Sequence, residues 1–121
     1  MNKIPHSIVE TESFLASTEK IWSEEEREAF KVYIGVNVFD GDVIPGAGGL
    51  RKVRWSRSGK GKRAGVRVIY YYYSENNPLY LLFAYAKGVK DDLTMDERKA
   101  LRDVAEILKK QFASKERGEG P

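Results

Sequence analysis

The sequence predicts an α+β fold, in which an N-terminal helical hairpin and a C-terminal helix pack on a small antiparallel β-sheet. Three observations favour this class: apolar residues recur at helical spacing near both ends, three β-rich runs fill the middle, and no linker or repeat divides the chain. The 121 residues, of which 41% are hydrophobic, suffice for one core, so we expect a single domain over residues 1–121.

The first third of the chain predicts a short strand and two helices. Residues 7–10 are typical of a strand, and helical periodicity follows over residues 11–22. The apolar positions of that helix are Phe14, Leu15, Thr18 and Ile21. Ser23 opens a Ser-Glu-Glu-Glu segment with capping-box spacing, so a second helix should run from there to about Val36.

The middle of the chain predicts the sheet. Residues 40–49 are dense in turn formers and should connect the helices to the first strand. Three strand-like runs follow, at residues 50–56, 64–74 and 79–87, with connections short enough for hairpins. We therefore expect an antiparallel meander.

A second capping-box pattern, Thr94 to Glu97, begins the last predicted helix. Its apolar face consists of Leu101, Val104, Ala105, Leu108 and Phe112, and it should reach about Ala113. Residues 114–121 are charged and contain two glycines, so we expect a frayed tail there.

The charges are distributed unevenly. The net charge is only +3, yet residues 43–74 hold eight Lys or Arg and no Asp or Glu. Residues 1–42 hold nine acids and four bases, and residues 75–121 hold nine of each. A local positive field favours a polyanion, and aromatic residues beside it can stack on exposed bases. RNA is the predicted ligand.

Composition excludes several kinds of chemistry. There is no cysteine, which removes disulfides, thiolate metal sites and thiol catalysis. Asp91 and Asp92 have no His or Cys neighbour, so we interpret them as solvated acids and expect no metal and no cofactor. No segment approaches the roughly 20 apolar residues that span a bilayer. We therefore expect a cytoplasmic protein with no membrane partner.

Alternation along the strands predicts a basic face on the sheet. It places Lys52 and Arg54 on the opposite face of their strand from Arg51. It likewise places Arg67 on the opposite face from Val66 and Val68. In the last strand, one face would hold Leu79, Leu81, Phe83, Tyr85 and Lys87. If Val66 and Val68 meet the helices, an outward, partly aromatic concavity is lined by Lys52, Arg54, Arg67, Tyr85 and Lys87.

Such a face suits cleavage of RNA without metal. Fixed cations can neutralise the phosphate oxygens in the transition state, and the 2′-hydroxyl of RNA supplies the nucleophile. Histidine, the usual acid–base residue, is nearly absent, so catalysis would have to rely on Lys, Arg and Tyr. Simpler interpretations stay open: residues 57–63 as a solvated loop, Trp55 as packing, and two of the tyrosines at 70–73 as core.

Residues 41–55 (GDVIPGAGGLRKVRW) and 59–71 (GKGKRAGVRVIYY) resemble the RelE/ParE toxin superfamily, especially its HigB-like, phage-type RelE branch. Tyr80-Leu81-Leu82, Tyr85-Ala86-Lys87 and Asp92-Leu93-Thr94 extend the similarity over most of residues 7–110. The resemblance implies the toxin of a type II toxin–antitoxin system, silenced by a cognate antitoxin. It further implies a ribosome-dependent, metal-independent mRNA endonuclease that inhibits translation. The alternatives are a ParE-like DNA gyrase poison and a nonenzymatic nucleic-acid-binding module.

The resemblance places the family's functional positions on Lys52, Arg54, Arg67, Tyr85 and Lys87, which we predict to be catalytic. From the basic run we predict RNA contacts at Arg51, Arg57, Lys60, Lys62 and Arg63. Two features depart from the family's pattern. Gly88 and Val89 follow Lys87 where relatives often have a polar and an acidic residue, and a tyrosine used by RelE near the last helix falls near Leu93.

The basic segment 57–63 should supply docking rather than chemistry, because a glycine-rich sequence is a poor support for oriented catalytic groups. Changing Lys60, Lys62 and Arg63 together to Ala should weaken ribosome binding. It should also lower the slope of log affinity against log salt by about one for each phosphate that the variant no longer neutralises. Cleavage on saturated ribosomes should change little; a variant that binds ribosomes normally and cannot cleave would place the segment in the active site.

Overall fold

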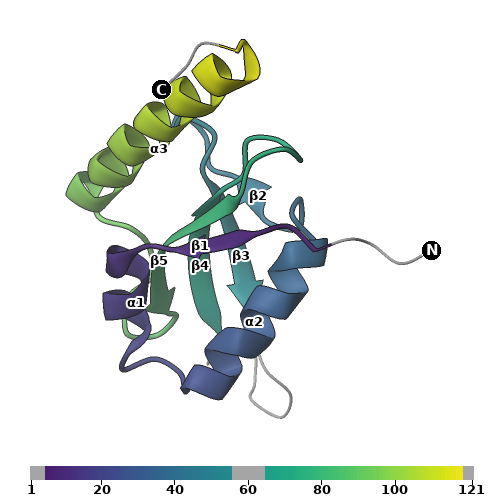
Figure 1. Ribbon diagram of the computed structural model, residues 1–121. Helices are drawn as coiled ribbons and strands as arrows, with labels where there is room; N and C mark the ends of the chain where they lie inside the picture. Colours follow the sequence, from purple (N-terminus) through teal and green to yellow (C-terminus); the bar gives the residue numbers. More distant parts are fainter. Residues whose placement is uncertain (1–4, 56–64, 119–121) are drawn as a thin grey trace.

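The computed structural model describes residues 5–55 and 65–118. Its elements, in chain order, are β1 (Ile8–Glu10), α1 (Glu12–Thr18), α2 (Glu24–Val36), β2 (Asp42–Val43), β3 (Arg51–Trp55), β4 (Val66–Tyr71), β5 (Leu79–Ala86) and α3 (Met95–Glu116). The five strands form one sheet in the order β1-β5-β4-β3-β2, with α1 and α2 on one face and α3 on the other (Figure 1). The predicted α+β class is confirmed.

The sheet is mixed rather than wholly antiparallel. Strands β2 to β5 pair antiparallel, but β1 lies parallel to β5, with Ile8 opposite Leu79. The Leu79 amide donates to the carbonyl oxygen of Ser7 (2.9 Å) and the Thr11 amide to that of Leu81 (3.2 Å), so the ladder extends beyond β1. A parallel pair needs a long connection, and here the chain between β1 and β5 contains α1, α2 and strands β2 to β4.

Two helices end at different residues from those predicted. Helix α1 ends at Thr18 rather than Trp22. Beyond it the Ile21 and Trp22 amides both donate to the Thr18 carbonyl oxygen, and Trp22 enters the core. Helix α3 continues past Ala113 to Glu116. There the Asn77 side-chain amide, in the turn between β4 and β5, donates to the Glu116 carboxylate (2.7 Å). That bond fastens the last turn of the helix.

The predicted caps form at the helix starts. The Ser23 hydroxyl accepts from the Glu26 amide (3.1 Å). Thr94 and Glu97 make the full reciprocal box. The predicted connection at 40–49 contains the two-residue strand β2, which pairs with β3.

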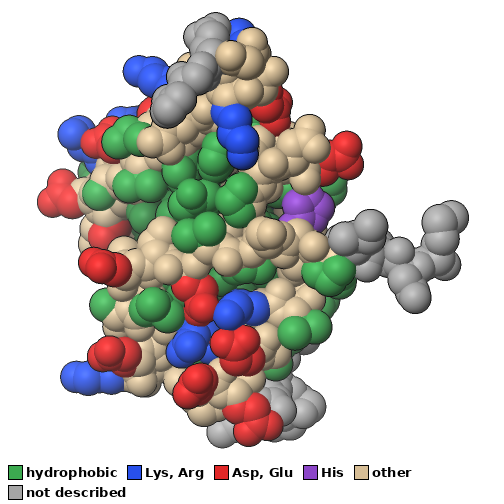
Figure 2. All heavy atoms as spheres, in the orientation of Figure 1, with side chains coloured by type: hydrophobic (Ala, Val, Ile, Leu, Met, Phe, Trp, Pro, Cys, Tyr) green, Lys and Arg blue, Asp and Glu red, His purple; other side chains and the backbone are tan. Residues whose placement is uncertain are grey.

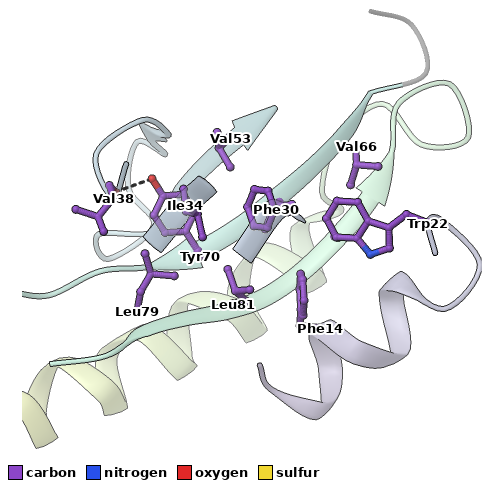
Figure 3. Close-up of a cluster of buried hydrophobic side chains, with 12 residues drawn as sticks. Phe14, Trp22, Phe30, Ile34, Val38, Val53, Val66, Tyr70, Leu79 and Leu81 are labelled. Carbon is purple, nitrogen blue, oxygen red and sulfur yellow. Dashed lines mark hydrogen bonds between the residues drawn. The ribbon is translucent and has the colours of Figure 1, made fainter. Parts of the chain in front are cut away.

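Two apolar cores lie on the two faces of the sheet, and β4 contributes to both. Val66, Val68 and Tyr70 face α1 and α2, whereas Ile69 and Tyr71 face α3. Figure 3 shows the first core, to which Phe14, Trp22, Phe30, Ile34, Leu79 and Leu81 also belong. Trp55 packs against Phe30 and Tyr33, as the packing interpretation expected. Tyr70 and Tyr71 are buried, and Tyr72 and Tyr73 are partly exposed.

The expectation that Leu79, Leu81, Phe83, Tyr85 and Lys87 share one face is wrong. Tyr70 lies opposite Leu81 and Ile69 opposite Phe83, so Leu82 is an additional residue in a β-bulge. The bulge reverses the alternation within β5. Leu79 and Leu81 therefore enter the first core, whereas Phe83 and Tyr85 lie on the α3 side.

Strand β1 is tied to α2 by an ion cluster. The Glu10 carboxylate accepts from Arg27 Nε and from Lys31 Nζ, each at 2.8 Å. The hydrogen bond that Lys31 donates to Glu10 raises the pKa of Lys31. Figure 2 shows acidic and basic side chains mixed over β1 and α2, and hydrophobic side chains gathered between β1 and α3. Within the described residues, no helix has the length and apolarity needed to cross a membrane.

The buried Tyr70 hydroxyl fastens the segment that leads into β2. It donates to the Val38 carbonyl oxygen (2.8 Å; Figure 3) and accepts from the Gly41 amide (2.9 Å). A Cβ at position 41 would lie 2.7 Å from Tyr70 Cε1, so only glycine fits beside the ring. The aromatic ring and its hydroxyl therefore set the path of this segment.

Replacing Tyr70 by Phe should destabilise the protein by about 1–3 kcal/mol, because two buried backbone groups lose their partner. Urea denaturation of the free protein measures the effect. Tyr73→Phe is the matched control, since within the described residues its hydroxyl makes no hydrogen bond and its ring packs on Phe112. Equal stability of both variants would contradict this role of Tyr70.

Candidate active site

Cross-strand register brings the predicted basic side chains together. Arg54 on β3 lies opposite Arg67 on β4, and Arg67 lies opposite Tyr85 on β5. Lys52 is in the neighbouring row, opposite Ile69. Directly paired residues share a face of a sheet, so these four side chains project to the same side, the side of α3. The predicted shared side is confirmed, but the expectation that it points outward, away from the helices, is wrong, because α3 packs on the same side against Ile69 and Tyr71.

Lys87 joins the same face just beyond the end of β5. Its amide donates to the Gly65 carbonyl oxygen (3.1 Å), which continues the pairing of β4 and β5 by one residue. Lys87 lies two positions after Tyr85, so both point to the same side. We call Lys52, Arg54, Arg67, Tyr85 and Lys87 the basic face.

Arg67 is a partly buried cation of the basic face. Its Nη1 atom is buried and has no hydrogen-bond partner within the described residues. Arg54, directly opposite, carries the same charge and is exposed. Like charges on paired residues repel each other, so this arrangement favours an anion that both guanidinium groups can contact.

The segment between β5 and α3 adds acidic groups to the basic face. Gly88, with a φ of 101°, turns the chain sharply after Lys87. Asp91 then lies 3.5 Å from Lys87 Nζ, and Asp92 Oδ1 lies 3.6 Å from Lys52 Nζ. The Tyr85 hydroxyl makes a long hydrogen bond of 3.5 Å to the same Asp92 oxygen, which also accepts from the Leu93 amide (2.8 Å).

These contacts set the protonation states. The hydrogen bond from the Leu93 amide, together with the nearby charges of Lys52 and Arg98, lowers the pKa of Asp92 against a smaller opposing effect of burial. Burial raises the pKa of Tyr85, and the charge of Asp92 raises it further, while Arg67 opposes both effects. At neutral pH the site therefore combines the Asp92 carboxylate and the neutral Tyr85 phenol with the Lys and Arg side chains of the basic face.

Asp92 is the residue that sequence reasoning missed. It was interpreted as a solvated acid, and its side chain is indeed 54% exposed, yet it contacts two residues of the basic face. One signal was present in the sequence: an acidic pair follows the Tyr-x-Lys segment within a few residues and directly precedes the helix cap at Thr94.

Other predicted residues do not join the basic face. Arg51 is on the opposite side of β3, where its guanidinium donates to the Gly41 carbonyl oxygen (2.7 Å) and lies 5.2 Å from the centre of the Phe39 ring. Its predicted role in RNA binding stays a prediction. Four further predicted contacts lie outside the described residues: Arg57, Lys60, Lys62 and Arg63.

The single histidine is also remote from this chemistry. The His6 amide donates to the Gly35 carbonyl oxygen (2.8 Å), and its Nε2 lies 3.2 Å from the Tyr72 hydroxyl. In the part of the chain that the structure describes, no group of three or more His, Cys, Asp or Glu side chains is placed to hold a metal ion.

A comparison with protein families identifies the family of the chain. The sequence matches the family model described as the RelE toxin of the RelE/RelB toxin–antitoxin system, and the match extends over residues 15–117. It includes every residue of the basic face and all of the structural elements except β1 and the start of α1. The match does not distinguish the HigB-like branch from others. The chain belongs to the RelE toxin family.

Proposed function

We propose that this RelE toxin is a ribosome-dependent endoribonuclease, which cleaves mRNA without a metal ion and inhibits translation. The observation that carries the proposal is the buried Nη1 of Arg67, which has no hydrogen-bond partner among the described residues, beside the exposed Arg54. A scissile phosphate bound there would give both guanidinium groups an anionic partner. Charge that develops on its oxygens in the transition state would strengthen those contacts.

The remaining side chains of the basic face fit the same reaction. Lys52 and Lys87 each have an acidic neighbour at 3.5–3.6 Å, so both are held near the sheet and both can turn to a phosphate. Tyr85 contributes a hydroxyl from the residue paired directly with Arg67, which is itself paired with Arg54. The 2′-hydroxyl of RNA is the proposed nucleophile, so the protein has to orient it and stabilise charge.

The family also identifies a protein partner. A RelE toxin of such a system has a cognate RelB antitoxin. We infer that the antitoxin silences this toxin, and that the toxin's other partners are the ribosome and its mRNA. Action on translating ribosomes would place the toxin in the cytoplasm.

Arg67→Ala should abolish growth arrest while leaving antitoxin binding intact. Removing one such electrostatic interaction costs on the order of 3 kcal/mol, which is about a hundredfold in rate. The assay is cleavage of a defined mRNA on programmed ribosomes, followed by primer extension. The control Lys99→Ala removes one positive charge from a side chain of α3 that is 70% exposed, and it should keep full activity.

Full toxicity of a well-expressed Arg67→Ala protein would overturn this role of Arg67. Induction of the wild-type protein also separates the two targets. Arrest of translation with new mRNA ends supports the ribonuclease. Double-strand DNA breaks with normal translation would indicate a gyrase poison instead.

Cleavage should persist in excess chelator, provided that polyamines keep the ribosomes intact. Because the 2′-oxygen attacks the adjacent phosphorus, the products should carry 2′,3′-cyclic or 3′-phosphate ends. End-specific ligation or mass spectrometry of the fragments measures this. Products with 5′-phosphate ends, or activity restored only by a divalent metal, would instead indicate a metal-activated water as nucleophile.

A further inference from the structure

One carboxylate reaches across the basic face. Asp92 follows the turn after β5, and its Oδ1 contacts Lys52 on β3 and the hydroxyl of Tyr85 on β5. Strand β4 lies between these two strands in the sheet, so Asp92 connects groups on either side of the strand that carries Arg67.

We propose that Asp92 is a positioning residue that acts through Tyr85. Its carboxylate accepts the hydrogen of the Tyr85 hydroxyl, so the lone pairs of the Tyr85 oxygen are left to accept a hydrogen bond from the 2′-hydroxyl of the RNA. A phenol has one hydrogen to donate and can also accept at the same oxygen. When its hydrogen is donated to Asp92, the Tyr85 hydroxyl can only accept a hydrogen bond from the substrate. The inference rests on the proposed function, because it assigns a role within that reaction.

The contacts of Asp92 explain why it stays in place although its side chain is half exposed. The Leu93 amide donates to the same oxygen at 2.8 Å, and the Lys52 ammonium supplies a counter-charge at 3.6 Å. Asp91, the preceding residue, is 91% exposed and pairs with Lys87 alone among the described residues. Two adjacent acids therefore differ in their contacts, and only Asp92 contacts Tyr85.

The groups around Tyr85 favour the same role. Its ring is buried in the second core, and its hydroxyl is affected by Asp92 from the loop, Arg67 from β4 and Glu97 from α3. Burial and the two carboxylates raise the pKa of Tyr85, while Arg67 lowers it. Tyr85 therefore keeps its hydrogen at neutral pH and can donate it to Asp92.

The first test measures the coupling without using activity. Tyr85 is titrated by NMR in protein labelled with ¹³C at tyrosine Cζ, and its signal is identified by its absence in Tyr85→Phe. Asp92→Asn removes the charge but keeps an oxygen that can accept from the Leu93 amide, so the loop should fold normally. The Tyr85 pKa should fall in Asp92→Asn and stay unchanged in Asp91→Asn. An unchanged pKa in Asp92→Asn would overturn the proposal.

The second test measures cleavage on programmed ribosomes in single turnover, with wild type, Asp92→Asn, Tyr85→Phe and the double variant. Asp92→Asn should lower the maximal rate by about 10- to 100-fold, a typical effect of a misplaced reacting group, with little change in the half-saturating concentration. If Asp92 acts through Tyr85, the double variant should be no slower than Tyr85→Phe. Multiplicative losses would overturn the proposal.

The two tests keep the hypotheses apart. If the wild-type protein does not cleave mRNA, the proposed function fails, and the titration still decides whether Asp92 and Tyr85 are coupled. If the wild-type protein cleaves and the double variant loses activity multiplicatively, the proposed function stands and the positioning role of Asp92 is wrong.

Discussion

Burial of the central strand β4 on both of its faces is the constraint on which the rest of the structure depends. A strand that alternates between two apolar faces needs a layer of helices on each side, and its neighbours must continue both faces. Here α1 and α2 cover Val68 and Tyr70, and α3 covers Ile69 and Tyr71. Arg67 is the one charged residue of β4, and the basic face forms around it.

The segment between β5 and α3 links the fold to the proposed chemistry. It ends a buried strand, reverses at Gly88 and begins α3 with the capping box of Thr94 and Glu97. Glu97 also pairs with Lys90, so the segment is held at its helical end by the same residue that caps the helix. Asp92 lies within this short, fastened segment, which is why one loop residue can reach both β3 and β5.

The tyrosines illustrate how burial assigns different roles to one residue type. Tyr70 is fully buried and satisfies the backbone at Val38 and Gly41, so its hydroxyl is structural. Tyr85 is also buried, but its hydroxyl reaches the edge of the second core and contacts a carboxylate beside the cations. Residue type alone does not distinguish these two roles. The roles differ because the Tyr70 hydroxyl lies within a core, whereas the Tyr85 hydroxyl lies at the edge of one.

Much of the fold and part of the candidate site follow from sequence. Periodicity and capping patterns predict the starts of α2 and α3, and alternation in β3 and β4 places Lys52, Arg54 and Arg67 on one side. These features are local, because a strand alternates and a helix repeats whatever lies beside it. Tyr85 was assigned to the correct face as well, although the bulge at Leu82 puts Leu79 and Leu81 on the other face.

Tertiary structure alone decided three features. Strand β1 pairs parallel with β5, far away in the chain, and no local pattern specifies such a partner. The bulge at Leu82 changes the faces of β5 because both strands must fit two cores of fixed position. Asp92 meets Lys52 and Tyr85 only because the loop folds back over the sheet. Sequence determined which residues face the same side of β3 and of β4. Packing determined the faces of β5 and which strands and loops meet, because those contacts join residues distant in the chain.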